Sequence, residues 1–329
     1  MNDFSYTRPS HPTEAISALL SQSDALYLGG GTNLIDHLKL GVVSPSQLVD
    51  VRYLGLDKIS SDSRAVTIGA GATNSAVAYH HEIQNHFPVL SEAILAGASP
   101  QLRNVATTAG NLLQKTRCTY FRDIHSACNK RVPGSGCSAI AGFNRSHAIL
   151  GVSSACIATH PSDMAVALTA LGAVIHVQDS SGVRKIPIES FYVPYGEDPA
   201  KENILKRGDL IIAVEVPQTP WFVHSRYVKA RDRSSYEFAL ASAAVAVDLD
   251  GGKIRNSRIA LGGVATKPWR AHAAEAALVG QTATIAAFRA AAEAELASAT
   301  AQKDNGYKIE LSKRVIVKAL QEAADVRGA

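Results

Sequence analysis

Four cysteines are the residues of this chain with the clearest capacity for chemistry. They are Cys118, Cys128, Cys137 and Cys156, and all of them fall within one stretch of a 329-residue sequence. Cysteines that serve as small core residues would be scattered along the chain. Four thiolates that converge on one point form the ligand set of a soft metal or a metal–sulfur cluster. The clustering therefore predicts an inorganic centre in this segment.

The spacing of the cysteines favours an iron–sulfur cluster over a zinc site. Nine, eight and eighteen residues separate successive cysteines, so no pair has the two-residue spacing of a zinc knuckle. The stretch between Cys128 and Cys137 contains Pro133, Gly134 and Gly136, which predict a loop. Fixing a loop backbone costs roughly 1–2 kcal/mol per residue. A [4Fe–4S] cluster with four cysteine ligands would offset that cost.

Other interpretations of the cysteines stay open. Two disulfides, a zinc ion or free thiols are each compatible with four cysteines. Four cysteines in a chain of this length do not make a disulfide scaffold, and they indicate a reducing compartment during folding. His125 and His147 flank the cysteines and could replace one of them as a ligand. Because four thiols suffice, we expect both histidines to be solvated or to lie outside the ligand set.

A glycine-rich turn near the N-terminus is the second feature that suggests a ligand. An apolar strand ending at Leu28 leads into Gly29-Gly30-Gly31-Thr32-Asn33, and a helical pattern restarts at Leu34. Such a turn lets a diphosphate approach the backbone closely, and amides at a helix start donate to its oxygens. A tight turn without a ligand is the alternative. The spacing differs from the Rossmann fingerprint, which disfavours a site of that type.

A second turn has the same small and hydroxylated character. It consists of Thr107-Thr108-Ala109-Gly110-Asn111. Two such turns could bind one elongated diphosphate from both sides, because the main-chain N–H groups of tight turns form anion-binding sites. Together they predict a dinucleotide or a flavin nucleotide.

Two charged residues each have an ordinary and a functional interpretation. Asp163 or its neighbour Ser162 is expected to cap a helix; alternatively, the Asp163 carboxylate accepts ribose or ribityl hydroxyls of a ligand. Lys229 lies in a run of alternating charge that normally marks an exposed strand. A lysine beside the pyrimidine edge of a flavin would instead favour the anionic reduced ring.

The order of expected elements predicts an α+β chain with three parts. Residues 1–55 form a strand, glycine turn, helix and strand, and residues 56–220 form a second unit with the cysteine loop inserted at 114–160. Pro217 and Pro220 mark a boundary. Residues 223–329 are expected to form a smaller domain with a three-stranded antiparallel sheet followed by alanine-rich helices.

Composition excludes several classes of protein. The net charge of +4 without a dense Lys/Arg block gives little support to nucleic-acid binding. The sequence contains no stretch of eighteen apolar residues, so no membrane span is expected. The residues after Met1 lack the pattern of a signal peptide. No nucleophile–base motif, zinc-protease motif or Walker loop is present. We therefore expect a carrier of redox cofactors without a substrate-transforming site of its own.

Taken in order, these segments resemble the FAD-binding subunit of the molybdenum hydroxylases, the family of xanthine dehydrogenase and carbon monoxide dehydrogenase. The resemblance covers essentially the whole chain. It is carried by the two turns and by the stretches His160-Pro161-Ser162-Asp163-Met164, Gly208-Asp209-Leu210-Ile211, Lys229-Ala230-Arg231 and Leu261-Gly262-Gly263-Val264-Ala265-Thr266-Lys267-Pro268-Trp269-Arg270.

The cysteine region resembles a narrower branch of that family. Its segments are Arg117-Cys118, Cys128-Asn129-Lys130-Arg131, Pro133-Gly134-Ser135-Gly136-Cys137 and Ala155-Cys156-Ile157-Ala158-Thr159. They are similar to the flavin subunit of the bacterial periplasmic aldehyde oxidoreductase, which has an additional [4Fe–4S] cluster. The resemblance implies that the four cysteines are the ligands of such a cluster.

The resemblance also implies a fold and a set of FAD contacts. The fold is a two-part FAD-binding domain of the vanillyl-alcohol-oxidase type, followed by a smaller α+β domain. Both turns would hold the FAD pyrophosphate, and Leu28 and Leu34 beside the first turn would also contact the cofactor. Asp163 would contact the ribityl or ribose region, and Lys229 would lie beside the isoalloxazine. Ile212 would pack against the flavin.

Finally, the resemblance implies partners and a compartment. The partners are a large molybdenum-cofactor subunit, where the aldehyde is oxidised, and a small subunit with two [2Fe–2S] clusters. Electrons would pass from these clusters to FAD and on to an external acceptor. The complex would be periplasmic by export with a signal-bearing partner, with a cytoplasmic location as the alternative. Two further hypotheses are a flavin subunit of a xanthine or nicotinate dehydrogenase that uses NAD, and a zinc-stabilised binding module.

Overall fold

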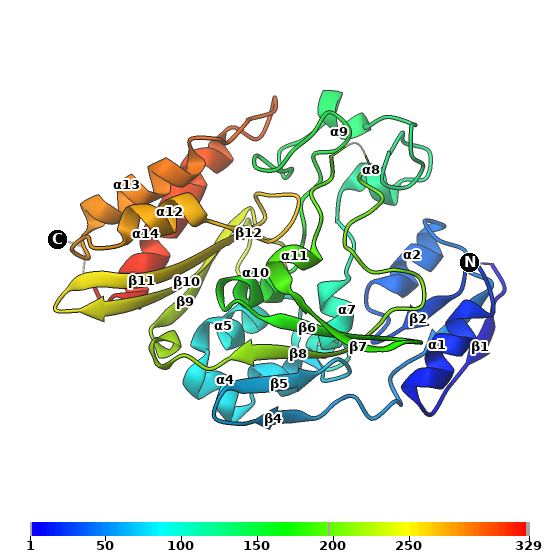
Figure 1. Cartoon of the computed structure of the whole chain (residues 1–329). Coiled ribbons are helices and arrows are strands. Elements are labelled where there is room, and N and C mark those ends of the chain that lie inside the picture. The colour runs from blue at the N-terminus through cyan, green and yellow to red at the C-terminus, as the bar shows by residue number, and fades with distance from the viewer. Residues whose placement is uncertain (1, 197, 327–329) are drawn as a thin grey trace.

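The structure is a computed structural model that describes residues 2–196 and 198–326 (Figure 1). The described chain forms three sheets, and each belongs to a different part of the sequence. Two large hydrophobic cores lie on the two sides of the C-terminal sheet. The fold is α+β, as the sequence predicts.

The N-terminal part is a small parallel sheet with two helices. Its strands run in the order β1-β3-β2. Leu28 ends β2 and is buried against Leu38 and Leu48, which places the glycine turn directly above this small core. The elements are β1 (Ser5–Thr7), α1 (Pro12–Leu20), β2 (Leu26–Leu28), α2 (Leu34–Leu40) and β3 (Gln47–Asp50).

The second part is an antiparallel five-stranded sheet in the order β4-β5-β8-β6-β7, covered by helices. The strands are β4 (Ile59–Ser61), β5 (Ala65–Gly69), β6 (Val174–Asp179), β7 (Gly182–Pro187) and β8 (Leu210–Pro217). The helices are α3 (Asn74–Ala78), α4 (His81–His86), α5 (Pro88–Ala96), α6 (Pro100–Arg103), α7 (Thr108–Leu112), α10 (Asp163–Ala170) and α11 (Ile188–Phe191). Every residue of α10 is buried, because this helix contacts α5 on one side and the C-terminal sheet on the other.

The cysteine-containing stretch contains little regular structure. Its helices are α8 (Thr119–Arg122) and α9 (Ser138–Ala141), each of a single turn. In Figure 1 this stretch lies at the top of the molecule, between the N-terminal part and the C-terminal helices. The sequence correctly predicts a loop here.

The C-terminal part packs three helices on one face of an antiparallel sheet. Strand β10 alternates between the two cores: Ala244 and Ala246 face the second part, while Ala243, Val245 and Val247 face the C-terminal helices. The strands, in the order β12-β11-β10-β9, are β9 (Ser225–Ala230), β10 (Ala241–Asp250), β11 (Lys253–Gly262) and β12 (Trp269–Arg270). The three helices are α12 (His272–Leu278), α13 (Ile285–Leu296) and α14 (Tyr307–Ala323), and a short 3-10 helix, η1 (Pro220–Val223), precedes β9.

One detail of the predicted sheet is wrong. The C-terminal sheet has four strands and not three, because the Trp269–Arg270 pair adds a short edge strand to β11. Two residues are too few for an alternating pattern, so the sequence gives no periodic signal there. Among the described residues, none of the helices combines the length and apolar character that a membrane crossing requires.

Candidate functional site: a cleft between two turns, next to four cysteines

The two predicted turns lie against each other. A Cβ atom added to Gly30 would come within 2.0 Å of the Val105 carbonyl oxygen, and one added to Gly29 would come within 2.9 Å of Thr107 Oγ1. Only glycine at position 30 allows the two backbones to approach this closely. Gly31 has a φ of 73°, in the left-handed region that favours glycine.

The amides of the first turn are free to bind a ligand. Within residues 2–196 and 198–326, the main-chain N–H groups of Gly29, Gly30, Gly31, Thr32 and Asn33 donate to no recorded acceptor. A run of unpaired N–H groups around glycines is an anion-binding arrangement. The first turn therefore has the donors that a diphosphate requires.

Four of the five amides of the second turn, those of Thr108 to Asn111, donate to acceptors inside the protein. Thr108 N and Ala109 N donate to the carbonyls of Ala72 and Ala70 at 2.9 and 3.0 Å. Gly110 N donates to Thr107 Oγ1 at 3.2 Å, because Thr107 caps α7. The two turns are thus not equivalent: the first offers donors, and the second forms the wall against which the first is held.

Two cavities meet at these turns. The His37 cavity has a volume of about 390 Å³ and is bordered by Gly29 to Leu34, Thr107, Ala109 and Gly110. The Lys229 cavity, of about 420 Å³, is bordered by Asn111, Asp163 and Lys229. Both share Thr32, Asn33 and Gly110, so they form one elongated cleft with the turns at its middle. Each volume is typical of a small-molecule site.

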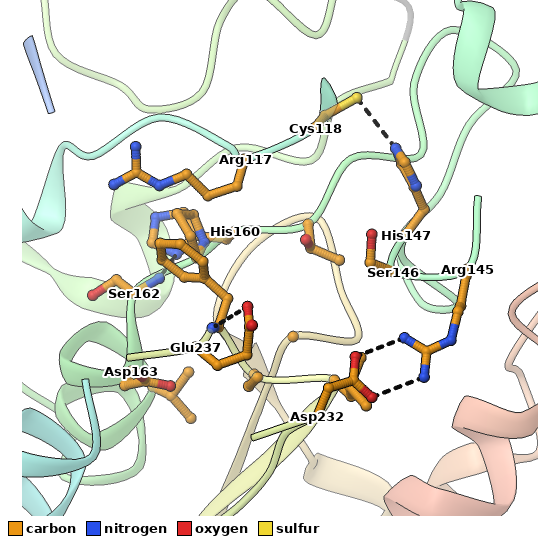
Figure 2. Close-up of a pocket in the computed structure, with 18 residues that line it drawn as sticks. Arg117, Cys118, Arg145, Ser146, His147, His160, Ser162, Asp163, Asp232 and Glu237 are labelled. Atoms are coloured by element: carbon orange, nitrogen blue, oxygen red, sulfur yellow. Dashed lines mark hydrogen bonds and ion pairs between the residues drawn. The ribbon is translucent and has the colours of Figure 1, made fainter. Parts of the chain in front are cut away.

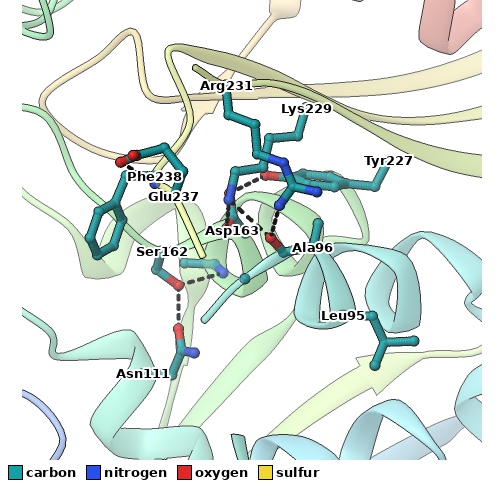
Figure 3. Close-up of polar contacts among 12 residues, drawn as sticks. Leu95, Ala96, Asn111, Ser162, Asp163, Tyr227, Lys229, Arg231, Glu237 and Phe238 are labelled. Carbon is teal, nitrogen blue, oxygen red and sulfur yellow. Dashed lines mark hydrogen bonds and ion pairs between the residues drawn. The ribbon is translucent and has the colours of Figure 1, made fainter. Parts of the chain in front are cut away.

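Asp163 and Lys229 form a buried ion pair at one end of this cleft (Figure 3). Lys229 Nζ donates to Asp163 Oδ2 at 2.8 Å and to the Ala96 carbonyl at 3.1 Å. Tyr227 Oη donates to Asp163 Oδ1 at 2.5 Å, and burial together with the Asp163 charge holds the pKa of Tyr227 well above its usual range. The carboxylate keeps unused lone pairs and the ammonium keeps one proton for a ligand.

Of the two candidate caps, Ser162 is confirmed and Asp163 is wrong, and the expectation of an exposed Lys229 is also wrong. Ser162, and not Asp163, caps α10 by accepting a hydrogen bond from Ala165 N at 2.9 Å. Lys229 is not an exposed strand residue, since its side chain is 3% exposed. Tyr227, which sequence reasoning missed, lies two residues before Lys229 on β9 and therefore on the same face of the strand.

Three predicted contact residues, Leu28, Thr108 and Ile212, do not border the cleft. Leu28 is buried in the small core with Leu38 and Leu48. The Thr108 side chain is fully buried and donates to the Ala72 carbonyl at 3.0 Å. Ile212 packs on the small core around Val49 and Leu54, whereas its neighbour Ile211 borders the His37 cavity. Because side chains alternate along a strand, a difference of one position changes the face.

The four cysteines come together beside the cleft. All of them are free thiols, so the disulfide alternative is not realised in the structure. Cys128 and Cys137 pair across a β-bridge, and Cys118 packs on the small cluster that contains Cys156. A hydrogen bond between Cys137 and Cys156 lowers the pKa of Cys137 to about 6 and raises the pKa of Cys156.

The sulfurs are not arranged around a single ion. Over the residues that the structure describes, no group of three or more His, Cys, Asp or Glu side chains could hold one metal ion. A [4Fe–4S] cluster uses one cysteine for each iron and so spreads its ligands over four metal atoms. The proximity of four free thiols around one loop is compatible with that wider ligand set.

A buried ion-pair network fixes the cysteine loop. Lys130 Nζ contacts Glu202 Oε1 at 2.5 Å, donates to the Pro199 carbonyl at 3.0 Å and lies 3.8 Å from the Tyr195 ring centroid. Glu202 also pairs with Lys115, whose main-chain N–H donates to Asn33 Oδ1 at 2.8 Å. The network therefore connects the cysteine loop to the first turn.

A third and smaller cavity, of about 200 Å³, joins the cysteines to the cleft (Figure 2). This Cys118 cavity is bordered by Cys118 and His147 at one end and by Asp163 at the other. It shares Arg117, Asp163 and Phe238 with the Lys229 cavity. His147 was expected to be solvated or outside the ligand set; it is buried, and its Nε2 lies 3.2 Å from Cys118 Sγ. His125 is exposed.

Comparison with known families agrees with this geometry. Residues 2–219 match the family model of the FAD binding domain in molybdopterin dehydrogenase, and residues 226–323 match that of the CO dehydrogenase flavoprotein C-terminal domain. The chain belongs to the FAD-binding subunits of the molybdenum hydroxylases.

Similar proteins support the same assignment. The aldehyde oxidoreductase FAD-binding subunit PaoB of Escherichia coli is 48% identical over 325 residues, covering 98% of this chain and 99% of that protein. The carbon monoxide dehydrogenase medium chain of Afipia carboxidovorans is 27% identical over 326 residues, covering 97% and 96%. A solved structure of carbon monoxide dehydrogenase from Hydrogenophaga pseudoflava contains a chain with a TM-score of 0.77 and 26% identity; the match covers 98% of this chain and 97% of that chain.

The residues on both sides of the turns fit FAD. The unpaired amides of Gly29 to Asn33 suit its diphosphate. The Lys229 cavity supplies polar groups for a ribityl chain and a charged wall for a flavin ring, and the His37 cavity supplies an apolar surface that includes Leu26 and Ile211. The elongated cleft is therefore suited to a dinucleotide that spans both cavities.

Replacing Gly30 by alanine should abolish retention of FAD. The added Cβ would collide with the Val105 carbonyl oxygen, so one of the two turns must move and the amide array is lost. Flavin absorbance relative to protein after desalting measures this effect. Gly306→Ala is the control, because position 306 has an ordinary φ and room for a Cβ. Full flavin content in Gly30→Ala would contradict the assigned position of the diphosphate.

Replacing Lys229 by methionine should destabilise the protein. The buried Asp163 carboxylate would lose its cation, and breaking a buried pair costs about 3–5 kcal/mol. Chemical denaturation of the flavin-free protein measures the change in the free energy of unfolding. Lys39→Met, at an exposed position on α2, should change it by less than about 0.5 kcal/mol. Equal free energies of unfolding for the two variants would show that the Asp163–Lys229 ion pair does not stabilise the fold.

Proposed function

We propose that this chain is the FAD- and [4Fe–4S]-containing electron-transfer subunit of a molybdenum-dependent aldehyde oxidoreductase. The single observation that carries the proposal is the 48% identity to an aldehyde oxidoreductase FAD-binding subunit over 98% of this chain. The matched length includes the segment in which four free thiols gather beside the cleft. Membership of the family supports FAD as one cofactor, and the four thiols would be the ligands of a second redox centre.

The residues of the chain hold the cofactors in place and tune them. FAD, when bound, accepts and releases electrons, and the protein supplies placement and electrostatics. The free amides of the first turn would bind the diphosphate, and Asp163 would accept ribityl or ribose hydroxyls. The remaining Lys229 proton, at 3% side-chain exposure, would donate to the flavin ring. A buried positive charge at this place favours additional negative charge on the ring.

The proposal includes two partner subunits. A large subunit with the molybdenum cofactor would oxidise the aldehyde, and a small subunit with two [2Fe–2S] clusters would pass the electrons to this chain. The chain would then deliver them to an external acceptor. The family membership and the absence of a nucleophile–base motif in the sequence support this division of labour. A periplasmic location by export with a signal-bearing partner is proposed from the resemblance of the cysteine region alone.

An NAD-dependent xanthine or nicotinate dehydrogenase subunit is the second candidate. The xanthine dehydrogenase FAD-binding subunit of Escherichia coli O157:H7 is 26% identical over 84% of this chain, well below the 48% of the aldehyde oxidoreductase subunit. Anaerobic addition of NADH to the purified complex separates the candidates. We expect the flavin absorbance to persist; rapid bleaching by NADH alone would favour the NAD-dependent enzyme. A reductant such as dithionite, which should bleach the flavin, is the control.

Replacing Cys137 by serine should remove the additional cluster. Serine at one of four ligand positions leaves an iron without its thiolate, so the complex should lose roughly four iron atoms per copy of this chain. Metal analysis of the purified complex measures the loss, and the retained partner clusters give the reference. Ser146→Ala, at an exposed position near the cysteines, should keep all iron. Unchanged iron in Cys137→Ser would refute the ligand set.

A further inference from the structure

His147 makes a contact that the function proposed above does not use. Its Nε2 lies 3.2 Å from Cys118 Sγ, as Figure 2 shows. The Cys156 sulfur instead accepts a main-chain N–H, from Ala158 at 3.4 Å. In the part of the chain that the structure describes, His147 is the only side chain other than a cysteine with a recorded hydrogen bond to any of the four sulfurs. The contact therefore singles out Cys118.

The surroundings of the ring assign its proton to Nε2. Nδ1 is buried and makes no hydrogen bond of ordinary geometry among the described residues, although the Asn144 main chain lies near the ring. A neutral imidazole carries one N–H, and placing it on Nδ1 would leave a buried donor without a well-aligned acceptor. Placing the proton on Nε2 directs it at the sulfur. With a thiolate at Cys118, the contact is then an N–H···S hydrogen bond in which His147 donates.

The C-terminal domain holds His147 in this position. Lys308 Nζ, on the buried first turn of α14, donates to the carbonyls of Ser146 and His147 at 3.0 Å each and of Gly263 at 2.6 Å. Asn305 Nδ2 donates to the His147 carbonyl at 3.3 Å. Asp304 N donates to Asn144 Oδ1 at 2.9 Å, and Asp304 Oδ2 accepts from Asn144 N at 3.3 Å. The ring is thus placed by a different domain from the one that carries Cys118.

Cys118 is also the cysteine that faces the flavin side. It is the one cysteine among the described residues that border the small cavity running to Asp163. A hydrogen bond to a cluster sulfur withdraws negative charge from it, which stabilises the more negative, reduced cluster. The effect would be exerted at the ligand closest to the route between cluster and FAD.

We propose that His147 is a positioning residue that raises the reduction potential of the cluster by donating its Nε2 proton to the Cys118 thiolate. The inference rests on the proposed function, because it requires a cluster at the four cysteines. His147 does not bind iron in this account. Its role is electrostatic and is separable from the assembly of the cluster.

The test is a potentiometric titration of the complete complex, monitored by electron paramagnetic resonance of the reduced cluster. In His147→Leu the donor is lost, and we expect the midpoint potential to shift downward with iron content unchanged. In His147→Gln the amide nitrogen is the same number of bonds from Cα as Nε2 of histidine, so its N–H can replace the lost donor. We therefore expect the midpoint potential to return most of the way to that of the unaltered protein. His125→Leu, an exposed histidine of the same loop, should match the unaltered protein.

Each outcome decides the inference. A His147→Leu complex with full iron and an unchanged potential would overturn it, and so would loss of iron in His147→Leu, which would make His147 a residue required for assembly. If neither variant folds, resonance Raman spectra of the unaltered complex in H2O and D2O replace the titration. A deuterium shift of an Fe–S(Cys) stretching band supports the N–H···S bond, and identical spectra overturn it. Absence of iron from the unaltered complex would instead refute the proposed function.

Discussion

The close approach of Gly30 to the Val105 carbonyl is the contact on which the cleft depends. A Cβ at position 30 would lie 2.0 Å from that oxygen, so the two turns can be this near only with glycine. The second turn pairs the amides of Thr108, Ala109, Gly110 and Asn111 within the protein, and it can therefore act as a rigid wall. The first turn, held against this wall, keeps its amides unpaired. Unpaired N–H groups raise the free energy of the folded protein, and they are explained if an anionic ligand accepts hydrogen bonds from them.

The C-terminal sheet connects the cleft to the cysteine segment. One face of β10 packs on the core of the FAD-binding part, and the other packs on the C-terminal helices. The same sheet carries Tyr227 and Lys229 to Asp163 at the end of the cleft. On the far side, the start of α14 fixes the main chain at Ser146 and His147. The domain therefore has a direct role in placing polar groups at both predicted redox centres.

The sequence predicts the parts of the site that have local chemical signals. Glycines in a row, a cluster of cysteines and a strand pattern at β8 are visible without a structure, and the structure places them around one cleft. The burial of Lys229 could not be predicted, because alternating charge is ordinarily a surface pattern, and solvent is excluded by the packing of β9 on α5 and by the ion pair with Asp163. The one-position difference between Ile211 and Ile212 also depends on the register of β8 in its sheet.

Other features lack any sequence signal because they depend on pairing across long separations. Strand β1 is three residues long and mostly exposed, and β12 has two residues, so neither has a recognisable period. The pairing of Glu202 with Lys115 and Lys130 joins segments more than seventy residues apart, as does the contact of Lys308 with the His147 carbonyl. Such partners are fixed by topology. They explain how a long loop with little regular structure can hold four thiols in place.

The most direct measurement of the central claim is an anomalous-difference map of the purified complex, recorded on both sides of the iron absorption edge. The account predicts iron density enclosed by the sulfurs of Cys118, Cys128, Cys137 and Cys156, with flavin density running along the adjacent cleft past Gly30 and Asp163. A map that places iron only in the partner subunits, with these sulfurs bound to no metal, would contradict it.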